Sequence, residues 1–166
     1  MPFRFAALAL LVAMPCHAAS SLTLLDTERN RPITVYLEPP AKPEQCSTAH
    51  KCPVAIFSPG YGNGANEYGF ITGALSGLGY LGVAVTHQLP TDAPMDPDGD
   101  LPRQRQVMIG RGAANLAFVQ KSLAPAHPRY DWSRVLLVGH SLGGDSSALR
   151  AGAERAQVAA LVTLDN

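Results

Sequence analysis

The chain has 166 residues, of which 46% are hydrophobic and 16% charged, and its formal net charge at pH 7 is zero. This length is sufficient for one domain with a hydrophobic core. A neutral chain without a Lys/Arg cluster lacks the basic face that nucleic acids or anionic membranes require, so neither is an expected partner. The arginines of 103–111 have the spacing of one solvated face of a helix.

The first 19 residues are typical of a secretory signal peptide. One positive charge, Arg4, precedes an apolar stretch from Phe5 to Met14, and small residues offer cleavage after Ala18 or Ala19. The apolar stretch is too short for a permanent membrane span, and a retained helical anchor is the weaker alternative. The sequence therefore predicts a periplasmic or secreted protein whose folded domain begins at residue 20.

Two cysteines remain after removal of the signal peptide, Cys46 and Cys52 in the segment CSTAHKC. In an oxidising compartment, two cysteines within one loop most simply form a disulfide. The alternative is a metal site that includes His50, but two thiols and one imidazole make a poor tetrahedral ligand set. We therefore expect a Cys46–Cys52 disulfide and no metal site.

Short apolar segments alternate with helical patterns from residue 22 onward. Strands are predicted at 22–26, 31–39, 54–58, 80–86, 134–138 and 158–164, and helices at 70–79, 103–123 and 141–153. The apolar members of the helix 103–123 that we expect to face inward are Val107, Ala114 and Phe118. This alternation predicts an α/β fold, with a mainly parallel sheet of about six strands and helices on both faces.

Ligands in such sheets gather at the carboxyl ends of the strands. This rule directs attention to the loops that begin near Ser58, His87, Gly139 and Leu164. A histidine at the end of a strand is more often structural than catalytic, and His87 is interpreted in that way.

The hexapeptide GHSLGG (139–144) follows a predicted strand and opens a predicted helix. Gly139 and Gly143 flank Ser141 and allow the sharp turn that presents a serine hydroxyl above the sheet edge. The helix N-terminus beneath the serine favours negative charge. A chance glycine-rich turn or a phosphate-binding turn is the alternative, but neither explains a serine centred between two glycines. The pattern predicts a nucleophilic serine.

With this turn and the segment SPGYG (58–62), the chain from about Ile33 onward resembles the α/β-hydrolase superfamily. The resemblance is closest to platelet-activating-factor acetylhydrolases, dienelactone hydrolases and cutinase-like esterases. It implies that Ser141 attacks a small-molecule or lipid-like ester, while the backbone N–H groups of Tyr61 and Leu142 form the oxyanion hole. It implies no metal and no organic cofactor.

Asp165 follows the last predicted strand, where some members of the superfamily carry the acid of the catalytic triad. The resemblance implies that Asp165 orients the base, and a turn aspartate is the alternative. The base of this family is a histidine that follows the acid, and no histidine follows Asp165 in the chain. Since the family fold needs about eight strands, we expect 20–166 to be an incomplete domain whose last strands and histidine lie beyond residue 166.

The predicted function is that of an exported serine hydrolase that cleaves carboxylic esters through an acyl-enzyme on Ser141. The alternatives within enzymes are a lipase or phospholipase-like acylhydrolase, a polyester hydrolase and a peptidase. The alternative outside enzymes is an inactive binding domain or a fragment that keeps the fold. Without its base, the chain as given is expected to be inactive.

Overall fold

The computed structural model describes residues 19–165. Residues 1–18, which contain nearly all of the predicted signal peptide, lie outside the described residues. No helix among residues 19–165 is both long enough and apolar enough to span a membrane.

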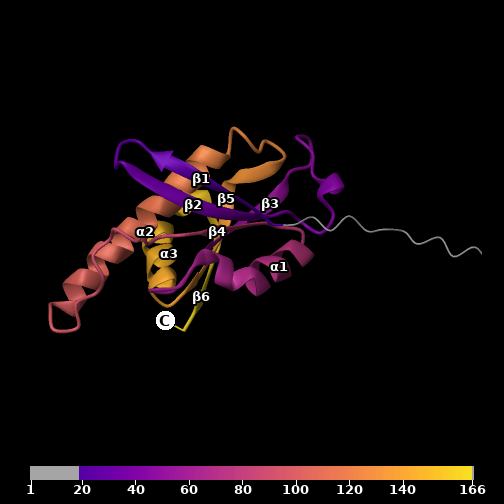
Figure 1. Cartoon of the computed structure of the whole chain (residues 1–166). Coiled ribbons are helices and arrows are strands. Elements are labelled where there is room, and N and C mark those ends of the chain that lie inside the picture. Colours follow the sequence, from indigo (N-terminus) through magenta and orange to yellow (C-terminus); the bar gives the residue numbers. More distant parts are fainter. Residues whose placement is uncertain (1–18, 166) are drawn as a thin grey trace, which may run out of the picture.

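A six-stranded sheet forms the centre of the fold, with the strand order β1-β2-β4-β3-β5-β6 (Figure 1). The strands are β1 (Ser20–Asp26), β2 (Arg31–Glu38), β3 (Cys52–Ser58), β4 (Leu81–Val85), β5 (Tyr130–His140) and β6 (Val158–Leu164). β2 runs antiparallel to both β1 and β4, whereas the pairs β3–β4, β3–β5 and β5–β6 are parallel. The predicted α/β fold with a mainly parallel sheet is therefore confirmed.

Helices cover both faces of this sheet. The α-helices are α1 (Gly69–Gly77), α2 (Leu101–Leu123) and α3 (Leu142–Ala153), and α2 and α3 lie side by side (Figure 1). Successive side chains of a strand point to opposite faces. On β3, Val54 and Ile56 join the cluster that contains Leu116 of α2, whereas Phe57 joins the cluster packed against Leu75 of α1.

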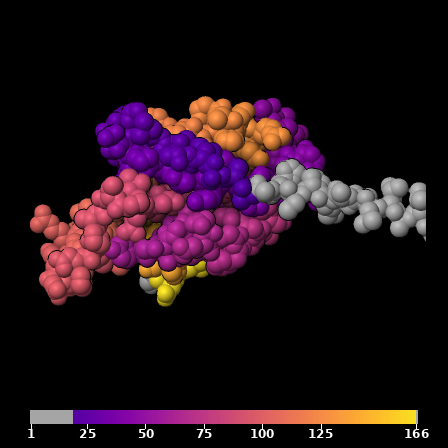
Figure 2. Space-filling view, viewed as in Figure 1, coloured from indigo at the N-terminus to yellow at the C-terminus, as the bar shows by residue number. Residues whose placement is uncertain are grey.

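The inward face of α2 differs from the predicted one. Val107 is 64% exposed, and the buried apolar side chains are Met108, Leu116, Val119 and Leu123. The first turns of α2 extend past the sheet (Figure 1), and with the preceding loop they form a projection at one end of the molecule (Figure 2). The expectation that Val107 faces inward is therefore wrong. The face that is buried includes the polar residues Asn115 and Gln120, which interrupt the apolar spacing by which the sequence would reveal it.

The predicted disulfide is present between Cys46 and Cys52. Cys46 is 3% exposed and belongs to the main hydrophobic cluster, so the bridge fastens the loop between β2 and β3 to the core. Cys52 is the first residue of β3. The strand therefore begins at the bridge, directly after a proline-rich loop that has little regular structure of its own.

Candidate active site

Ser141 lies at the corner between β5 and α3 with a φ of 48° and a ψ of −124°. A positive φ is unfavourable for any residue with a Cβ and persists only where surrounding contacts enforce it. The backbone N–H of Ser141 donates to the carbonyl of Leu164 at 2.9 Å, and its carbonyl accepts from the N–H of Gly144 at 2.7 Å. The corner is thus held on one side by β6 and on the other by the first turn of α3.

Gly139 and Gly143 permit the close packing on which this corner depends. A Cβ added to Gly139 would lie 2.5 Å from the carbonyl oxygen of Gly143. A Cβ added to Gly143 would collide with the carbonyl oxygens of Ser58 and Pro59. The backbone of α3 therefore approaches β5 and the loop after β3 more closely than any side chain would allow.

A small cavity of about 20 Å³ lies where the loop after β3 faces the start of α3. It is lined by Pro59, Gly60, Tyr61, His87, Gln88, Met108, Arg111, Leu142, Gly143 and Ser146. The two residues expected to supply oxyanion donors, Tyr61 and Leu142, thus border the same space. Leu142 is the first residue of α3, so its N–H has no acceptor within the helix and is available to a ligand.

Tyr68 and His140 support the loop that carries Tyr61. The Tyr68 hydroxyl lies 2.9 Å from Nδ1 of His140 and accepts a hydrogen bond from Nδ2 of Asn63 at 3.0 Å. His140 packs directly against Gly60, where an added Cβ would lie 2.8 Å from Nδ1. Sequence reasoning assigned no role to Tyr68, because its contact with His140 joins residues far apart in the chain and leaves no local pattern.

Asp165 extends from the end of β6 with its side chain 93% exposed and a φ of 53°. Its carboxylate is 3.9 Å from Nε2 of His140, the other side of the ring that Tyr68 contacts. Asp165 therefore lies close to the serine corner, since Leu164 binds the backbone of Ser141. Its charge, however, faces solvent and His140.

The histidine rings of residues 19–165 do not hydrogen-bond to the Ser141 hydroxyl. Nε2 of His87 contacts the Ser58 hydroxyl at 3.0 Å, and the His127 ring lies near Tyr130. The described residues thus place no histidine ring in hydrogen-bond contact with the side chain of Ser141. They also contain no group of three His, Cys, Asp or Glu side chains placed to hold a metal ion.

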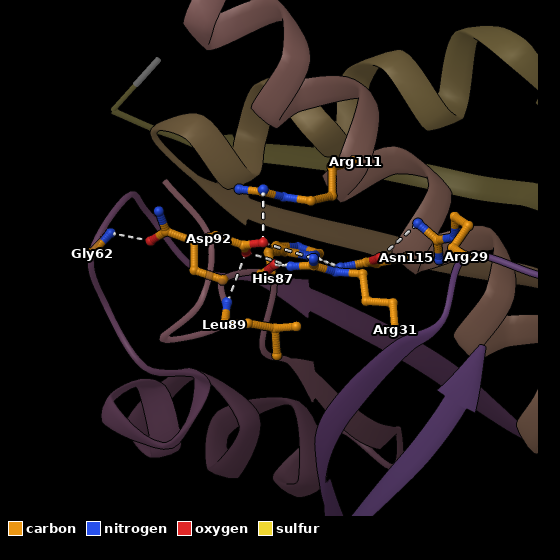
Figure 3. A network of polar contacts seen from close by, with 9 residues as sticks. Arg29, Arg31, Gly62, His87, Leu89, Asp92, Arg111 and Asn115 are labelled. Carbon is orange, nitrogen blue, oxygen red and sulfur yellow. Dashed lines mark hydrogen bonds and ion pairs between the residues drawn. The ribbon is translucent and has the colours of Figure 1, made fainter. Parts of the chain in front are cut away.

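Three largely buried charged side chains form the Arg31–Asp92–Arg111 cluster (Figure 3), and one of them, Arg111, borders the cavity. Arg31 donates through Nη1 and Nη2 to both carboxylate oxygens of Asp92, at 2.9 Å and 2.6 Å. Nη1 of Arg111 lies 3.2 Å from Oδ1 of the same carboxylate. The hydrogen bonds from Arg31, together with the charge of Arg111, lower the pKa of Asp92 to about 2.

Arg103 and Arg105 are exposed, as expected for a solvated helix face, but Arg111 departs from that expectation, since its side chain is 20% exposed and paired with Asp92. Arg105, too, pairs with Asp145 at 2.6 Å. The loop after β4 folds back against α2 and carries Asp92 there, which no local spacing reveals. Helical spacing could have indicated that Arg111 is partly buried, because it lies one turn from Met108 and one turn from Asn115, which are both buried.

His87 connects this cluster to the sheet. Nδ1 of its ring lies 3.4 Å from the Asn115 amide nitrogen, and its carbonyl accepts from Nη2 of Arg31 at 2.6 Å. Burial lowers the pKa of His87 to about 3, and the nearby charges of Arg111 and Arg31 act in the same direction. The ring is therefore neutral at pH 7, and it contacts Ser58 and Asn115 while also bordering the cavity.

Comparison with solved structures found the same fold in proteins of low sequence identity. An epoxide hydrolase from Vigna radiata matches with a TM-score of 0.62 and 18% identity, covering 89% of this chain and 40% of its own. A thermostable carboxyl esterase from Bacillus coagulans matches with a TM-score of 0.61 and 13% identity, covering 88% of this chain and 44% of its own. Epoxide hydrolase A from Mycobacterium thermoresistibile matches with a TM-score of 0.61 and 15% identity, covering 88% of this chain and 39% of its own.

These likenesses show the α/β-hydrolase fold. The chain spans about 40% of the length of the solved proteins that it matches. Neither a protein-family model nor a curated protein sequence matched the chain.

Proposed function

We propose that the protein is a serine hydrolase that cleaves carboxylic esters through an acyl-enzyme on Ser141. The observation that carries this proposal is the strained Ser141 corner beside a cavity bordered by Tyr61 and Leu142. A hydroxyl at that corner attacks a carbonyl carbon, and the charge that develops on the carbonyl oxygen is received by backbone donors. The N-terminus of α3 adds a favourable dipole.

The nature of the nucleophile favours esters over epoxides, the other substrate class named among the structural neighbours. Attack of Ser141 on an epoxide carbon would leave an ether between the serine and the opened ring, and water does not cleave such an ether readily. Attack on an ester expels the alcohol and leaves a serine ester, whose carbonyl remains open to water. Only the second route regenerates the enzyme.

Activation of Ser141 requires a general base, which we propose is a histidine outside residues 19–165. Asp165 is the candidate acid that orients this histidine, since it follows β6 directly beside the serine corner. The contact between Asp165 and His140 at 3.9 Å is long for an ion pair, so the carboxylate is accessible to a better partner.

We further propose that the protein acts outside the cytoplasm. The signal-peptide pattern of the first 19 residues supports export. The Cys46–Cys52 disulfide is compatible with an oxidising compartment.

A fluorophosphonate probe tests the proposal on the full-length protein. We expect covalent labelling of the wild type, none in Ser141→Ala, and undiminished labelling in Ser133→Ala, which alters an exposed serine of β5. Labelling that persists in Ser141→Ala would exclude Ser141 as the nucleophile. A wild type that is neither labelled nor able to hydrolyse p-nitrophenyl esters would favour the inactive binding domain instead. Assays on triglycerides, polyester film and peptide anilides would then separate the enzyme classes.

A further inference from the structure

The Arg31–Asp92–Arg111 cluster contains two guanidinium groups but one carboxylate. The side chains of Arg31 and Asp92 are each 12% exposed, and that of Arg111 is 20% exposed. Among the described residues, Asp92 is the partner of both ion pairs. A largely buried cation without its own counter-ion is costly, and this cluster carries one positive charge more than its carboxylate neutralises.

The surplus charge is concentrated on Arg111. Both oxygens of Asp92 are bound by Arg31, and Oδ2 also accepts from the backbone N–H of Leu89 at 2.8 Å. Arg111 reaches Asp92 through one longer contact, at 3.2 Å. The Nε atoms of Arg111 and Arg31 are both buried and have no hydrogen-bond partner among the described residues. Burial lowers the pKa of Arg111, the charge of Asp92 partly offsets this, and the charge of Arg31 lowers the pKa further.

Arg111 borders two neighbouring spaces. One is the cavity of about 20 Å³ shared with Tyr61 and Leu142. The other is a groove of about 250 Å³ beside α2, lined by Ala93, Pro94, Arg103, Gln104, Val107, Met108 and Arg111. Met108 and Arg111 belong to both linings. A ligand that extends from the oxyanion donors along α2 would therefore pass Arg111 and enter a groove with an apolar wall.

Acidic residues near the start of α2 do not neutralise Arg111. Asp100 caps the helix by accepting from the N–H of Arg103, and eleven residues separate it from Arg111, or about 16 Å along the axis. Asp96 accepts from the N–H of Asp98, and its backbone is bound to the side chain of Gln104, which lies about 10 Å from Arg111 along the helix axis. The groove thus contains the incompletely paired guanidinium of Arg111 next to apolar Met108, together with the exposed guanidinium of Arg103.

We propose that Arg111 binds a carboxylate carried by the substrate, and that the preferred esters bear this anionic group on the portion lying along α2. A guanidinium–carboxylate pair is a strong, directional contact in a partly buried site. Half-esters of short dicarboxylic acids have the required chemistry, because one end is a cleavable ester and the other an anion. The assignment of a substrate rests on the proposed esterase function, whereas the binding preference does not require turnover.

Isothermal titration calorimetry on the full-length protein carrying Ser141→Ala tests the preference without hydrolysis. The probes are monomethyl glutarate, an anion at neutral pH, and dimethyl glutarate, its neutral counterpart. We expect monomethyl glutarate to bind about tenfold more tightly when Arg111 is present than in Arg111→Gln. Dimethyl glutarate should bind equally to both, Arg111→Lys should keep part of the preference, and added salt should weaken it.

Arg105→Gln is the matched control, because Arg105 lies on the same helix, is 45% exposed and pairs with Asp145. It should leave the ratio of the two affinities unchanged. Equal binding of both probes by protein that retains Arg111 would overturn the inference, and this comparison needs no variant at position 111 to fold. Fluorophosphonate labelling of Ser141 without an anion preference would overturn only the inference. An anion preference without labelling would overturn only the esterase proposal.

Discussion

The backbone N–H of Ser141 donates a hydrogen bond to the carbonyl of Leu164 over 2.9 Å, so the corner after β5 is joined to the end of β6. The strands are parallel, with His140 paired to Leu164. Asp165, the next residue, is therefore delivered to the same sheet edge as the serine. The closeness of these two residues is a property of the sheet register and not of their separation in the chain.

Asp165→Asn tests whether this placement is catalytic. We expect kcat for ester hydrolysis by the full-length protein to fall about 10⁴-fold, because an amide no longer stabilises the required form of the base. The melting temperature should hardly change, since the side chain is 93% exposed. Asp98→Asn, in an exposed loop, serves as the control. Near-normal turnover in Asp165→Asn would assign the acid to another residue.

Gly143→Ala tests the packing of the serine corner. The new Cβ would meet the backbone carbonyls of Ser58 and Pro59, which cannot rotate away as a side chain would. We expect the free energy of unfolding in urea to fall by about 1–3 kcal/mol. Gly110→Ala in α2 is the matched change, because nothing lies within 4 Å of the added Cβ. It should be neutral or stabilising by about 0.5–1 kcal/mol, and an equal loss in both variants would contradict this account.

The lowered pKa of His87 predicts a specific dependence of stability on pH. The unfolded chain protonates this histidine near pH 6.5, whereas its pKa in the folded protein is about 3. Between these values the unfolded state holds one more proton, so stability is complete above pH 6.5 and falls as the pH decreases. From pH 7 to pH 5 we expect a loss of about 2 kcal/mol from this residue.

Urea unfolding at a series of pH values measures this loss, and His87→Gln should reduce it. Asp92 contributes little between pH 7 and pH 5, because its pKa is lowered from 3.8 to about 2 in the folded protein and both values lie below this range. His127 is the comparison, since burial lowers its pKa as well but it lies in a surface loop. His127→Gln should therefore change the pH dependence less than His87→Gln. The opposite order would show that the His87 ring is accessible to protons in the folded state.

The Cys46–Cys52 disulfide predicts both a chemical and a thermodynamic result. Alkylation of the unfolded protein without reductant should leave the mass unchanged at these cysteines, and reduction should expose two thiols. The bridge closes a short loop with a sequence separation of 6, so a Cys46→Ser/Cys52→Ser variant should lose about 2 kcal/mol of stability. Alkylation of both cysteines before reduction would exclude the bridge.

Predictions succeeded where the structure of a segment is caused by the residues of that segment itself. Apolar runs such as 54–58 became buried strands, and glycines around Ser141 became a strand-to-helix corner. The inward face of α2 was misplaced at Val107, because buried Asn115 and Gln120 are polar and satisfy their hydrogen bonds through distant partners. A hydrophobic pattern cannot identify a face whose buried members are polar.

The sequence by itself determined the α/β fold, the disulfide pair and the serine corner, because backbone sterics and the burial of apolar side chains act over a few residues. Tertiary structure alone decided that Tyr68 supports the loop of Tyr61, and that Asp92 lies between Arg31 and Arg111. Those contacts depend on which loops the strand order brings together at one edge of the sheet. Electrostatic interactions act through space, so the charge that borders the site is set by the folded arrangement and not by the order of residues.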